Sequence, residues 1–464
     1  MARTAGRYGL AYTTNHPDSA VRFDDLVSAY LGFGRDIGDQ LKALLADDRD
    51  MPLAHVAKGY FFKLFGSAAM SERARKSLVE AERLFESADA TDREHLHLEA
   101  LRAWCADDLD RTTDTWEAIL LDHPKDVFAL RLAHFNHFYA GEARKMRDSV
   151  ARVLPQWTDA DPDIGYVHGM YGFALEESGD YARGERFGRM AVERNPKDAW
   201  SVHAVAHVME MQGRHSEGIA WVNRHEADWS TTNNFRFHLY WHRALYHLER
   251  HEFEQVLSIY DDYVASDIAS DMYLDVCNAA SLLWRLEMYG VDVGDRWKGL
   301  AEVSMRHVDD RELIFVSLHY LIALLKSGET EAAARMAAQL EGYANSAVAQ
   351  GRVSARVGVG TAAALAAFAR GDAGTAVDAL LPIRYDLYCM GGSHAQRDLF
   401  EEVLIAAAVK ARPRIARRLL AERTALKPRS AWSWRNYAAA LRADGAPEAA
   451  LDAERQAETV LSAA

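Results

Sequence analysis

Histidines gather in the middle of the chain, in two stretches whose spacing is that of one helix face. His203, His207 and Glu210 follow one another by about one helical turn in DAWSVHAVAHVMEMQGR. His238 and His242 have the same relation in NNFRFHLYWHRALYHLE. Two imidazoles at i and i+4 can bind one metal ion, and a carboxylate one turn further on can complete the site or act as a base. The chemistry that these residues suggest is metal binding or general acid–base catalysis.

The metal that such a set favours is zinc or iron, because both accept imidazole nitrogen and carboxylate oxygen. The sequence differs from the HExxH motif of zinc proteases, since Ala204 stands where that motif has its catalytic glutamate. A histidine and glutamate pair that acts without metal, and a purely structural set of hydrogen-bonded histidines, stay open. The candidate metal ligands are His203, His207, Glu210, His238 and His242, and the candidate catalytic pair is His207 and Glu210.

Further candidates for ligand binding are aromatic and basic residues near the same helices, and a glycine-rich loop. Aromatic side chains supply contact area, and histidines can fix the orientation of a ligand. In GGSHAQRDLF, Ser393 is a predicted N-cap, and the loop could present amide donors and His394 to a carboxylate. A capped turn between repeats is the alternative. The predicted ligand-binding residues are Trp200, His203, His238, Trp241, His242, His319, His394 and Arg397.

The elements that must position these residues are helices arranged in repeats. From about residue 70, helical segments alternate with short turns at a period near roughly 34 residues. In the unit that starts at Gly165, the small residues Gly172, Gly184 and Ala191 and the terminating Pro196 stand where the tetratricopeptide pattern requires them. Other units are predicted to start at Arg93, Val127, Ala199, Phe237, Ile314, Val357 and Ala431.

We therefore predict an all-α fold, an α-solenoid of tetratricopeptide-like helix pairs curled around a concave groove or central pocket. Each pair has an apolar face that only its neighbours can cover. No alternating run is long enough to predict a strand, so we expect no sheet. The predicted organisation is an amino-terminal helical cap at 1–70, repeats at 71–430 and a carboxyl-terminal capping helix pair at 431–464. Within the cap we expect one helix over FDDLVSAYLGFGRDIGDQLKALLADD and a second that begins at Pro52.

The repeat register also predicts which side chains face the groove. The first helix of each pair lines it, and this places the two histidine pairs and Glu210 on the inner surface. Corresponding helices of successive repeats stack about 10 Å apart, so we expect these side chains to open onto one shared cavity. By contrast, His215, His225, His247 and His251 are expected at surface or turn positions.

Four stretches resemble the tetratricopeptide-repeat protein 38 family, also called the StaR-like family. They are NPKDAWSVHAVAHVMEMQGR at 195–214, NNFRFHLYWHRALYHLE at 233–249, SLLWRLEMYGVDVGDRW at 281–297 and GGSHAQRDLFEEVL at 391–404. The similarity extends over nearly the whole chain. The resemblance implies a helical-repeat fold in a soluble protein, and it does not assign a biochemical activity.

Composition narrows the class of partner. Lys and Arg number 54 against 68 Asp and Glu, a formal net charge of −14, which disfavours binding to the phosphates of a nucleic acid. No apolar run approaches the roughly 20 residues of a membrane span, and no signal peptide is recognisable, so we expect a cytoplasmic protein without a membrane partner. Cys105, Cys277 and Cys389 lie far apart, which predicts reduced thiols.

The leading functional prediction is a helical-repeat protein that binds a small molecule or a short peptide in a groove lined by histidine and tryptophan. The first alternative is a metal-dependent enzyme, a hydrolase or an oxygenase, that uses the same His and Glu residues. The second is a pure protein-interaction scaffold. A serine hydrolase of the nucleophile-elbow type is excluded, because the chain contains no G-x-S-x-G motif.

Overall fold

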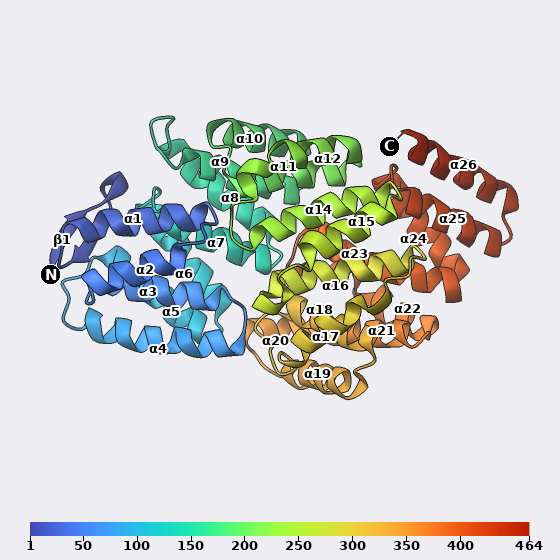
Figure 1. Ribbon diagram of the computed structural model, residues 1–464. Helices are drawn as coiled ribbons and strands as arrows, with labels where there is room; N and C mark the ends of the chain where they lie inside the picture. The colour runs from blue at the N-terminus through green and yellow to red at the C-terminus, as the bar shows by residue number, and fades with distance from the viewer. Residues whose placement is uncertain (464) are drawn as a thin grey trace. The chain divides into compact units, whose positions relative to one another are not determined.

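The computed structural model describes residues 1–463, most of which lie in helices joined by short turns (Figure 1). Successive helices pack as antiparallel pairs, so the fold is an all-α array of tetratricopeptide-like repeats, as predicted. Within residues 1–463, no helix combines the length and the apolar character needed to cross a membrane.

Contacts within the chain separate it into two compact units. The first comprises Met1–Val205, Ala227–Phe235 and Ala347–Gln350, and the second comprises Ala206–Glu226, Arg236–Ser346 and the chain from Gly351 onwards. Helices α11 (Ala199–Met211) and α14 (Phe235–Glu249) therefore begin in the first unit and end in the second. The predicted boundaries near residues 70 and 430 rest on the sequence repeats. The division by contacts does not test them, so they stay predictions.

The first unit consists of an amino-terminal hairpin followed by helix pairs. Its elements are β1 (Ala2–Ala5), β2 (Ala11–Thr14), α1 (Asp18–Leu31), α2 (Ile37–Asp47), α3 (Pro52–Lys63), α4 (Ala68–Phe85), α5 (Asp92–Cys105), α6 (Leu109–Asp122), α7 (Val127–Tyr139), α8 (Ala143–Val153), α9 (Ile164–Glu177), α10 (Tyr181–Arg194), the start of α11, and most of the short helix α13 (Glu226–Trp229).

The second unit continues the helix pairs to the end of the described chain. After the last turns of α11 it contains α12 (His215–Arg224), α14, α15 (Phe253–Ile259), α16 (Tyr273–Met288), α17 (Trp297–Met305), α18 (Ile314–Ser327), α19 (Thr330–Tyr343), the end of α20 (Ala349–Val353), α21 (Val359–Ala369), α22 (Ala373–Leu380), α23 (His394–Ala411), α24 (Pro413–Leu426), α25 (Ala431–Ala443) and α26 (Pro447–Ala463).

The α9–α10 pair shows why small residues recur at fixed positions in the repeats. A methyl group at Gly172 would lie 2.9 Å from the amide nitrogen of Gly188 and 3.0 Å from the carbonyl oxygen of Gly184. Those distances are shorter than any stable contact, so only glycine lets the two backbones approach this closely. The turn between the helices passes through Gly179 at φ +82°, which an L side chain rarely adopts. The register predicted for this unit is confirmed.

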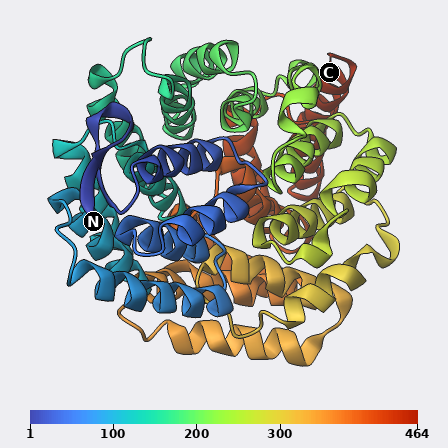
Figure 2. The ribbon, with the colours of Figure 1, turned by 60° about the vertical axis from the view of Figure 1, so that its left-hand side comes forward.

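The prediction of no sheet is wrong at the amino terminus. There β1 and β2 pair antiparallel, with Ala2 opposite Thr14 and Ala5 opposite Ala11. Each strand has four residues, which is too short for an alternating pattern to be recognised in the sequence. One side of the hairpin is covered, because Tyr12 of β2 is buried against Phe23 of α1. Figure 2 shows the hairpin lying next to α1.

The hairpin is fixed by Glu94 in the first turn of α5. The buried carboxylate of Glu94 accepts hydrogen bonds from the amide and the hydroxyl of Thr13, both at 2.8 Å, and from the amide of Thr91 at 2.9 Å. Thr91 in turn caps α5, so this carboxylate completes a capping box and anchors β2 at the same time.

The first predicted helix of the cap is also wrong in one respect, because it is two helices. The chain leaves the helical conformation after α1 at Gly32, and Phe33 has φ +55°, in the left-handed region. The turn places the ring of Phe33 face to face with that of Phe235, with centroids 4.2 Å apart. The second predicted helix begins as expected, with Pro52 in the first turn of α3.

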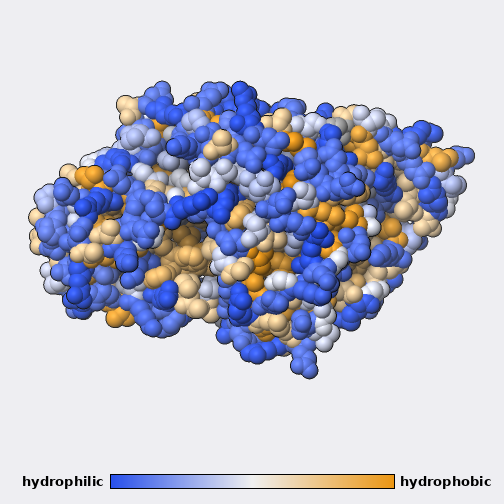
Figure 3. Space-filling view, viewed as in Figure 1, coloured by the Kyte–Doolittle hydropathy of each residue, from blue (hydrophilic) through white to orange (hydrophobic). Residues whose placement is uncertain are grey.

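The helix pairs keep polar side chains outward. On the face drawn in Figure 3, hydrophilic residues predominate and apolar ones form separate patches. In the second unit the final pair, α25 and α26, encloses Ala438, Leu441 and Ala450, while Arg442 and Glu448 are exposed.

Candidate metal centre and its charged cavity

Helices α11 and α14 carry the predicted histidines, and both are deeply buried. Every residue of α11 from Ala199 to Met209 is buried, so this helix has no solvated face over that length. The part of α11 in the second unit contributes His207 and Glu210. One turn apart on α14, His238 and His242 are buried as well. A histidine in such an environment requires polar partners, because burying an unpaired imidazole is unfavourable.

Three imidazoles meet in the second unit. The ring centroids of His207 and His242 are 4.4 Å apart, and those of His238 and His242 are 4.8 Å apart. One nitrogen from each of the three rings lies within 4.8 Å of the others. The exposed fractions are 0 % for His207, 3 % for His238 and 0 % for His242. The two predicted histidine stretches thus contribute to one compact cluster.

Two of the imidazoles are held by hydrogen bonds through Nδ1. His242 Nδ1 lies 2.9 Å from Oε2 of Glu210, and His238 Nδ1 lies 2.9 Å from Oδ1 of Asn278 on α16. The Asn278 oxygen is an acceptor, so His238 carries its proton on Nδ1 and keeps a lone pair on Nε2. Metal-binding histidines in other proteins are oriented in this way, by an acceptor on the nitrogen that does not face the metal.

Burial keeps the cluster uncharged. It lowers the pKa of His242 to about 3. It also lowers the pKa values of His207 and His238 well below their ordinary value, and the neighbouring His242 adds to both effects. Neutral imidazole is the form that binds metal ions, so at neutral pH a metal would not have to displace protons from these rings.

Trp241, a predicted ligand-binding residue on α14, packs within the cluster. Its ring stacks on His238 with centroids 5.1 Å apart, and its Nε1–H donates to the Ser281 hydroxyl at 3.1 Å. Trp241 is 0 % exposed. Its observed contacts fix the orientation of His238 from one side.

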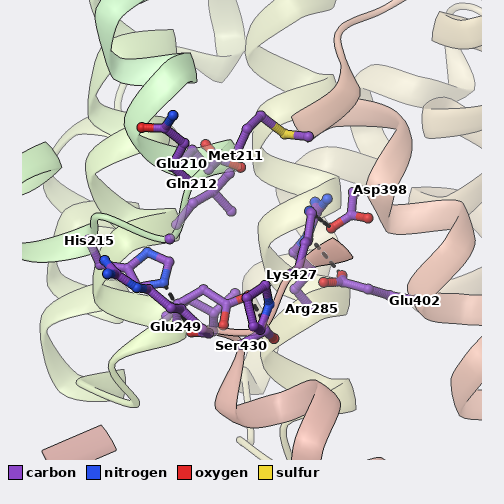
Figure 4. A pocket seen from close by; sticks show the side chains of 15 residues that line it. Glu210, Met211, Gln212, His215, Glu249, Arg285, Asp398, Glu402, Lys427 and Ser430 are labelled. Carbon is purple, nitrogen blue, oxygen red and sulfur yellow. Dashed lines mark hydrogen bonds and ion pairs between the residues drawn. The ribbon is translucent and has the colours of Figure 1, made fainter. Parts of the chain in front are cut away.

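A cavity of about 40 Å³ adjoins Glu210 in the second unit (Figure 4). Its wall includes the carboxyl groups of Glu210, Glu249 and Glu402 and the cations Arg285 and Lys427. These side chains come from four helices and from the turn that follows α24. The cavity is therefore a small, highly charged space, unlike the apolar pockets that hold most organic ligands.

Ion pairs on one side of the cavity join α16, α23 and the end of α24. Arg285 Nε lies 3.0 Å from Oε2 of Glu402, and Lys427 Nζ lies 2.7 Å from Asp398. Figure 4 shows both pairs side by side. Arg423 makes a bidentate contact to Asp398 at 2.7 and 2.9 Å. Burial alone would raise the pKa of Asp398, but Arg423 and Lys427 hold it well below its usual value.

The other carboxyl groups of the cavity bind protons more tightly than usual. Burial raises the pKa of Glu210 to about 7, although Lys427 and Arg285 oppose this shift. Burial also raises the pKa of Glu402 to about 7 and raises that of Glu249. Carboxyl groups with pKa values near 7 can both accept and donate a proton at neutral pH, which is the property required of a general acid–base catalyst.

The remaining predicted residues of the second unit have local partners. His319 Nδ1 bonds the carbonyl of Phe315 at 2.8 Å, and its ring packs near Phe400. Ser393 caps α23, as predicted, through a capping box with Gln396. Next to this cap, Arg397 donates to the carbonyl of Gly392, while His394 is the first residue of the helix.

Trp200 and His203 belong to the first unit. The ring of His203 stacks on Phe173 with centroids 5.3 Å apart, and it lies 4.9 Å from the ring of Trp200 and 5.2 Å from that of Phe235. His203 precedes His207 by one turn of α11, which is the helix that continues into the second unit.

Several residues of the site were not among the sequence candidates. Asn278 and Arg285 lie on α16 in a largely apolar stretch, VCNAASLLWRL, and Glu402 lies on α23 next to Glu401. A lone charged residue in a buried helix is an informative signal, since such residues are rarely buried without a partner. His215 was expected at a surface or turn position, but it is 7 % exposed and its Nε2 lies 3.4 Å from the carbonyl of Arg429.

The chain is distantly similar to several solved helical-repeat structures. No family model matches the chain. The human IFIT1 dimer with m7Gppp-AAAA is 13 % identical over 88 % of this chain and 90 % of that chain, with a TM-score of 0.40. Yeast Tom70 is 13 % identical over 89 % and 95 %, with a TM-score of 0.33. The P58(IPK) TPR domain is 12 % identical over 80 % and 93 %, with a TM-score of 0.22.

These likenesses concern the helical-repeat fold alone. The resemblance to the tetratricopeptide-repeat protein 38 family stays a prediction. The expected absence of nucleic-acid binding rests on net charge alone and stays unsupported by these comparisons.

Proposed function

We propose that the second unit is a zinc-dependent hydrolase for a small polar substrate, with His207, His238 and His242 as the metal ligands. The observation that carries this proposal is the meeting of three neutral, buried imidazoles whose nitrogens lie within 4.8 Å of one another. Nitrogen ligands of a tetrahedral zinc ion lie about 3.3 Å apart, given Zn–N distances of about 2.0–2.1 Å, so binding would draw these nitrogens together by up to about 1.5 Å. Three protein ligands leave a position for water or substrate, as in catalytic zinc sites.

Zinc fits this ligand set better than iron does. Iron oxygenases use two histidines and one carboxylate as direct ligands. Here the carboxylate of Glu210 is bonded to Nδ1 of His242 at 2.9 Å, which is the place of an orienting partner. Glu210 and Asn278 hold two of the rings in position for a metal that binds their Nε2 atoms.

Glu210 has a second task in this proposal, because it also lines the charged cavity. A bound zinc ion would supply a water molecule of lowered pKa, as zinc does in catalytic sites. Glu210, whose carboxyl group lines the cavity, would take up a proton from such a water and would return it to the leaving group. Arg285 and Lys427 stabilise the negative charge that develops on a substrate oxygen.

The size of the cavity restricts the substrate. A volume of about 40 Å³ corresponds to roughly three water molecules, whereas sites for organic ligands have about 300 Å³ or more. We therefore propose a small molecule, or the small reacting end of one, in preference to a peptide.

Metal analysis tests the centre. The full-length protein, expressed with added zinc, is expected to hold one zinc ion per chain. His207→Ala, His238→Ala and His242→Ala are each expected to lose at least about nine-tenths of it, since removal of one of three ligands opens the site. His247→Ala is the control on the same helix, because His247 bonds Glu252 and faces away from the cluster. Wild-type protein that binds neither zinc nor iron overturns the proposal.

Turnover tests the chemistry. Hydrolysis of a small activated ester such as p-nitrophenyl acetate is expected to require zinc and to fall about 100-fold or more in Glu210→Gln, the loss expected for a general base. Zinc binding without any turnover favours a second candidate, a ligand-binding protein with a structural metal. The near-complete burial of all three imidazoles is the observation in favour of that candidate.

A further inference from the structure

The first unit contains a buried arginine whose hydrogen-bonding edge is not satisfied by residues 1–463. Arg131 on α7 is 2 % exposed, and its Nε and Nη2 atoms have no hydrogen-bond partner. Arg93, which is equally buried in the same unit, binds Asp126 at 2.7 Å. A buried charge without hydrogen bonds is costly, so a stable fold needs a partner for Arg131 that lies outside these residues.

The two unpaired atoms of Arg131, Nε and Nη2, are the ones through which an arginine binds a carboxylate best. Nε and Nη2 form one edge of the planar guanidinium, and their two parallel N–H groups match the two oxygens of a carboxylate. A lysine cannot offer this geometry. Two parallel N–H donors therefore select a planar anion such as a carboxylate, whereas a positive charge without this geometry would accept an anion of any shape.

Aromatic rings cover the guanidinium, whereas its buried Nε and Nη2 atoms have no hydrogen-bond partner among the described residues. The Cζ atom of Arg131 lies 4.3 Å from the ring centroid of Phe135, 4.7 Å from that of Trp200 and 5.0 Å from that of Phe33. Cation–π contacts use the face of a guanidinium and fix its plane. Phe33 reaches this position through its left-handed backbone conformation, φ +55°, which is strained for a residue with a side chain.

Neutral donors next to Arg131 are unsatisfied as well. The indole Nε1–H of Trp200 and the hydroxyl of Tyr30 have no hydrogen-bond partner within the described chain. The indole belongs to the ring that stacks on the guanidinium, and Tyr30 is close enough to act electrostatically on Arg131. Several buried donors without an acceptor in the described chain favour an acceptor as the ligand, and the charge of Arg131 favours an anion.

Asp198 is the carboxylate that could have neutralised Arg131, but its oxygens are used elsewhere. They accept hydrogen bonds from the backbone amides of Trp200 at 3.1 Å and Ser201 at 3.2 Å, and from the Ser201 hydroxyl. Burial raises the pKa of Asp198 to about 6. Burial lowers the pKa of Arg131 to about 10, which still leaves it charged at neutral pH.

We propose that Arg131 anchors a ligand site in the first unit for a small monocarboxylate with an apolar or aromatic body. One buried positive charge is balanced by one negative charge, whereas a phosphate dianion would leave a net charge in an apolar surrounding. Phe33, Phe135 and Trp200 provide contact surface for the apolar body. Arg131 binds the carboxylate through Nε and Nη2, and the neutral donors complete its coordination.

Calorimetry and thermal shift with defined probes test this site in the full-length protein. Sodium benzoate is compared with sodium acetate, with inorganic phosphate and with the neutral isostere benzamide, at constant ionic strength. The protein carries His207→Ala and is treated with a chelator, so that no metal in the second unit contributes a carboxylate site. We expect one benzoate per chain, weaker binding of acetate, and no binding of benzamide.

Variants separate recognition from general stability. Arg131→Lys keeps the positive charge but removes the two parallel N–H donors, and it is expected to weaken benzoate binding at least about 10-fold. Tyr30→Phe keeps the shape and removes one donor, with an expected loss of a few-fold. Arg183→Met is the control, because Arg183 also stacks on an aromatic ring, that of Tyr171, but is exposed. The control is expected to bind benzoate as the parent protein does.

The proposal is overturned if the parent protein binds benzoate no better than benzamide, or if Arg131→Lys binds it equally well. Phosphate binding that is tighter than benzoate binding overturns the assignment to a monocarboxylate. If Arg131→Lys does not fold, Tyr30→Phe decides, since unchanged affinity in that variant contradicts the role of the neutral donors.

Discussion

His242 Nδ1 lies 2.9 Å from Oε2 of Glu210, so a buried imidazole and a buried carboxyl share one hydrogen bond. Burial affects the two groups in opposite directions, lowering the pKa of His242 to about 3 and raising that of Glu210 to about 7. A proton added to this pair near neutral pH is therefore held by the carboxyl group and not by the imidazole. This pair connects the imidazole cluster with the charged cavity.

The raised pKa of Glu210 makes part of the stability dependent on pH. The ordinary pKa is 4.5 and the folded value is about 7, so the folded state binds this proton more strongly. The contribution is fully present below pH 4.5 and is lost as pH rises through about 7, at about 1.4 kcal/mol per pH unit and about 3 kcal/mol in all. Glu210→Gln cannot titrate, so the stability difference between wild type and variant is expected to change by that amount.

Urea denaturation of the metal-free protein between about pH 5 and pH 8 measures this difference. Wild type is expected to lose stability relative to Glu210→Gln as pH rises. A difference that stays constant over this range would mean that Glu210 titrates normally in the folded protein.

Asn278 is expected to matter for metal affinity although it is not a proposed ligand. Asn278→Ala removes the acceptor that orients His238 and should weaken zinc binding about 10- to 100-fold, as outer-shell changes do. Cys277→Ala is the matched control on α16, because Cys277 is as deeply buried as Asn278 on the same helix and is a free cysteine that does not hold His238 or Trp241. Competition with a chromophoric chelator gives the affinities. Equal losses in the two variants would show that general packing, and not the orientation of His238, controls binding.

Gly172 is expected to be irreplaceable. Gly172→Ala brings a methyl group to 2.9 Å from the backbone of Gly188, and should destabilise the protein by about 1–3 kcal/mol or more. Gly38→Ala on α2 is the control, since nothing lies within 4 Å of the added methyl group. That change should stabilise by about 0.4–1 kcal/mol, because it restricts the unfolded chain. Thermal denaturation compares the unfolding midpoints of the two variants, and similar midpoints would contradict the close approach of α9 and α10.

The final helix pair is expected to keep the second unit soluble. Deleting residues 431–464 removes Trp432, whose ring stacks near Tyr289 with centroids 5.9 Å apart, and uncovers the side of α24 that packs on α25. Terminal repeats cap the stack in such folds. The truncated protein should aggregate, as measured by size-exclusion chromatography with light scattering. A monodisperse and fully helical truncation would disprove this role.

The sequence could predict features that repeat along the chain. Small residues such as Gly172 and Gly184 recur at fixed offsets because each helix pair needs the same close approach. The break at Phe33 could not be predicted, since a residue with a Cβ atom in the left-handed region leaves no sign in the local pattern. It is specified by tertiary contacts, including the one to Phe235.

For the candidate site, helical spacing predicts which residues share one face of a helix. It does not predict which other helices pack against that face. His238 and His242 could be grouped because they lie one turn apart. Asn278, which is 40 residues from His238, could not, because a single sequence contains no record of which helices become neighbours. The same holds for Glu402 opposite Arg285.

The bonds from Thr13 to Glu94 also bear on how the protein folds during its synthesis. The two residues are 81 positions apart, so β2 leaves the ribosome long before its anchor exists. At about 5–20 residues per second, the delay is roughly 4 to 16 s. During that time this segment of the nascent chain has an open strand edge, and it can be fixed only when the start of α5 emerges. The hairpin is therefore synthesised well before the contact that holds it in place can form.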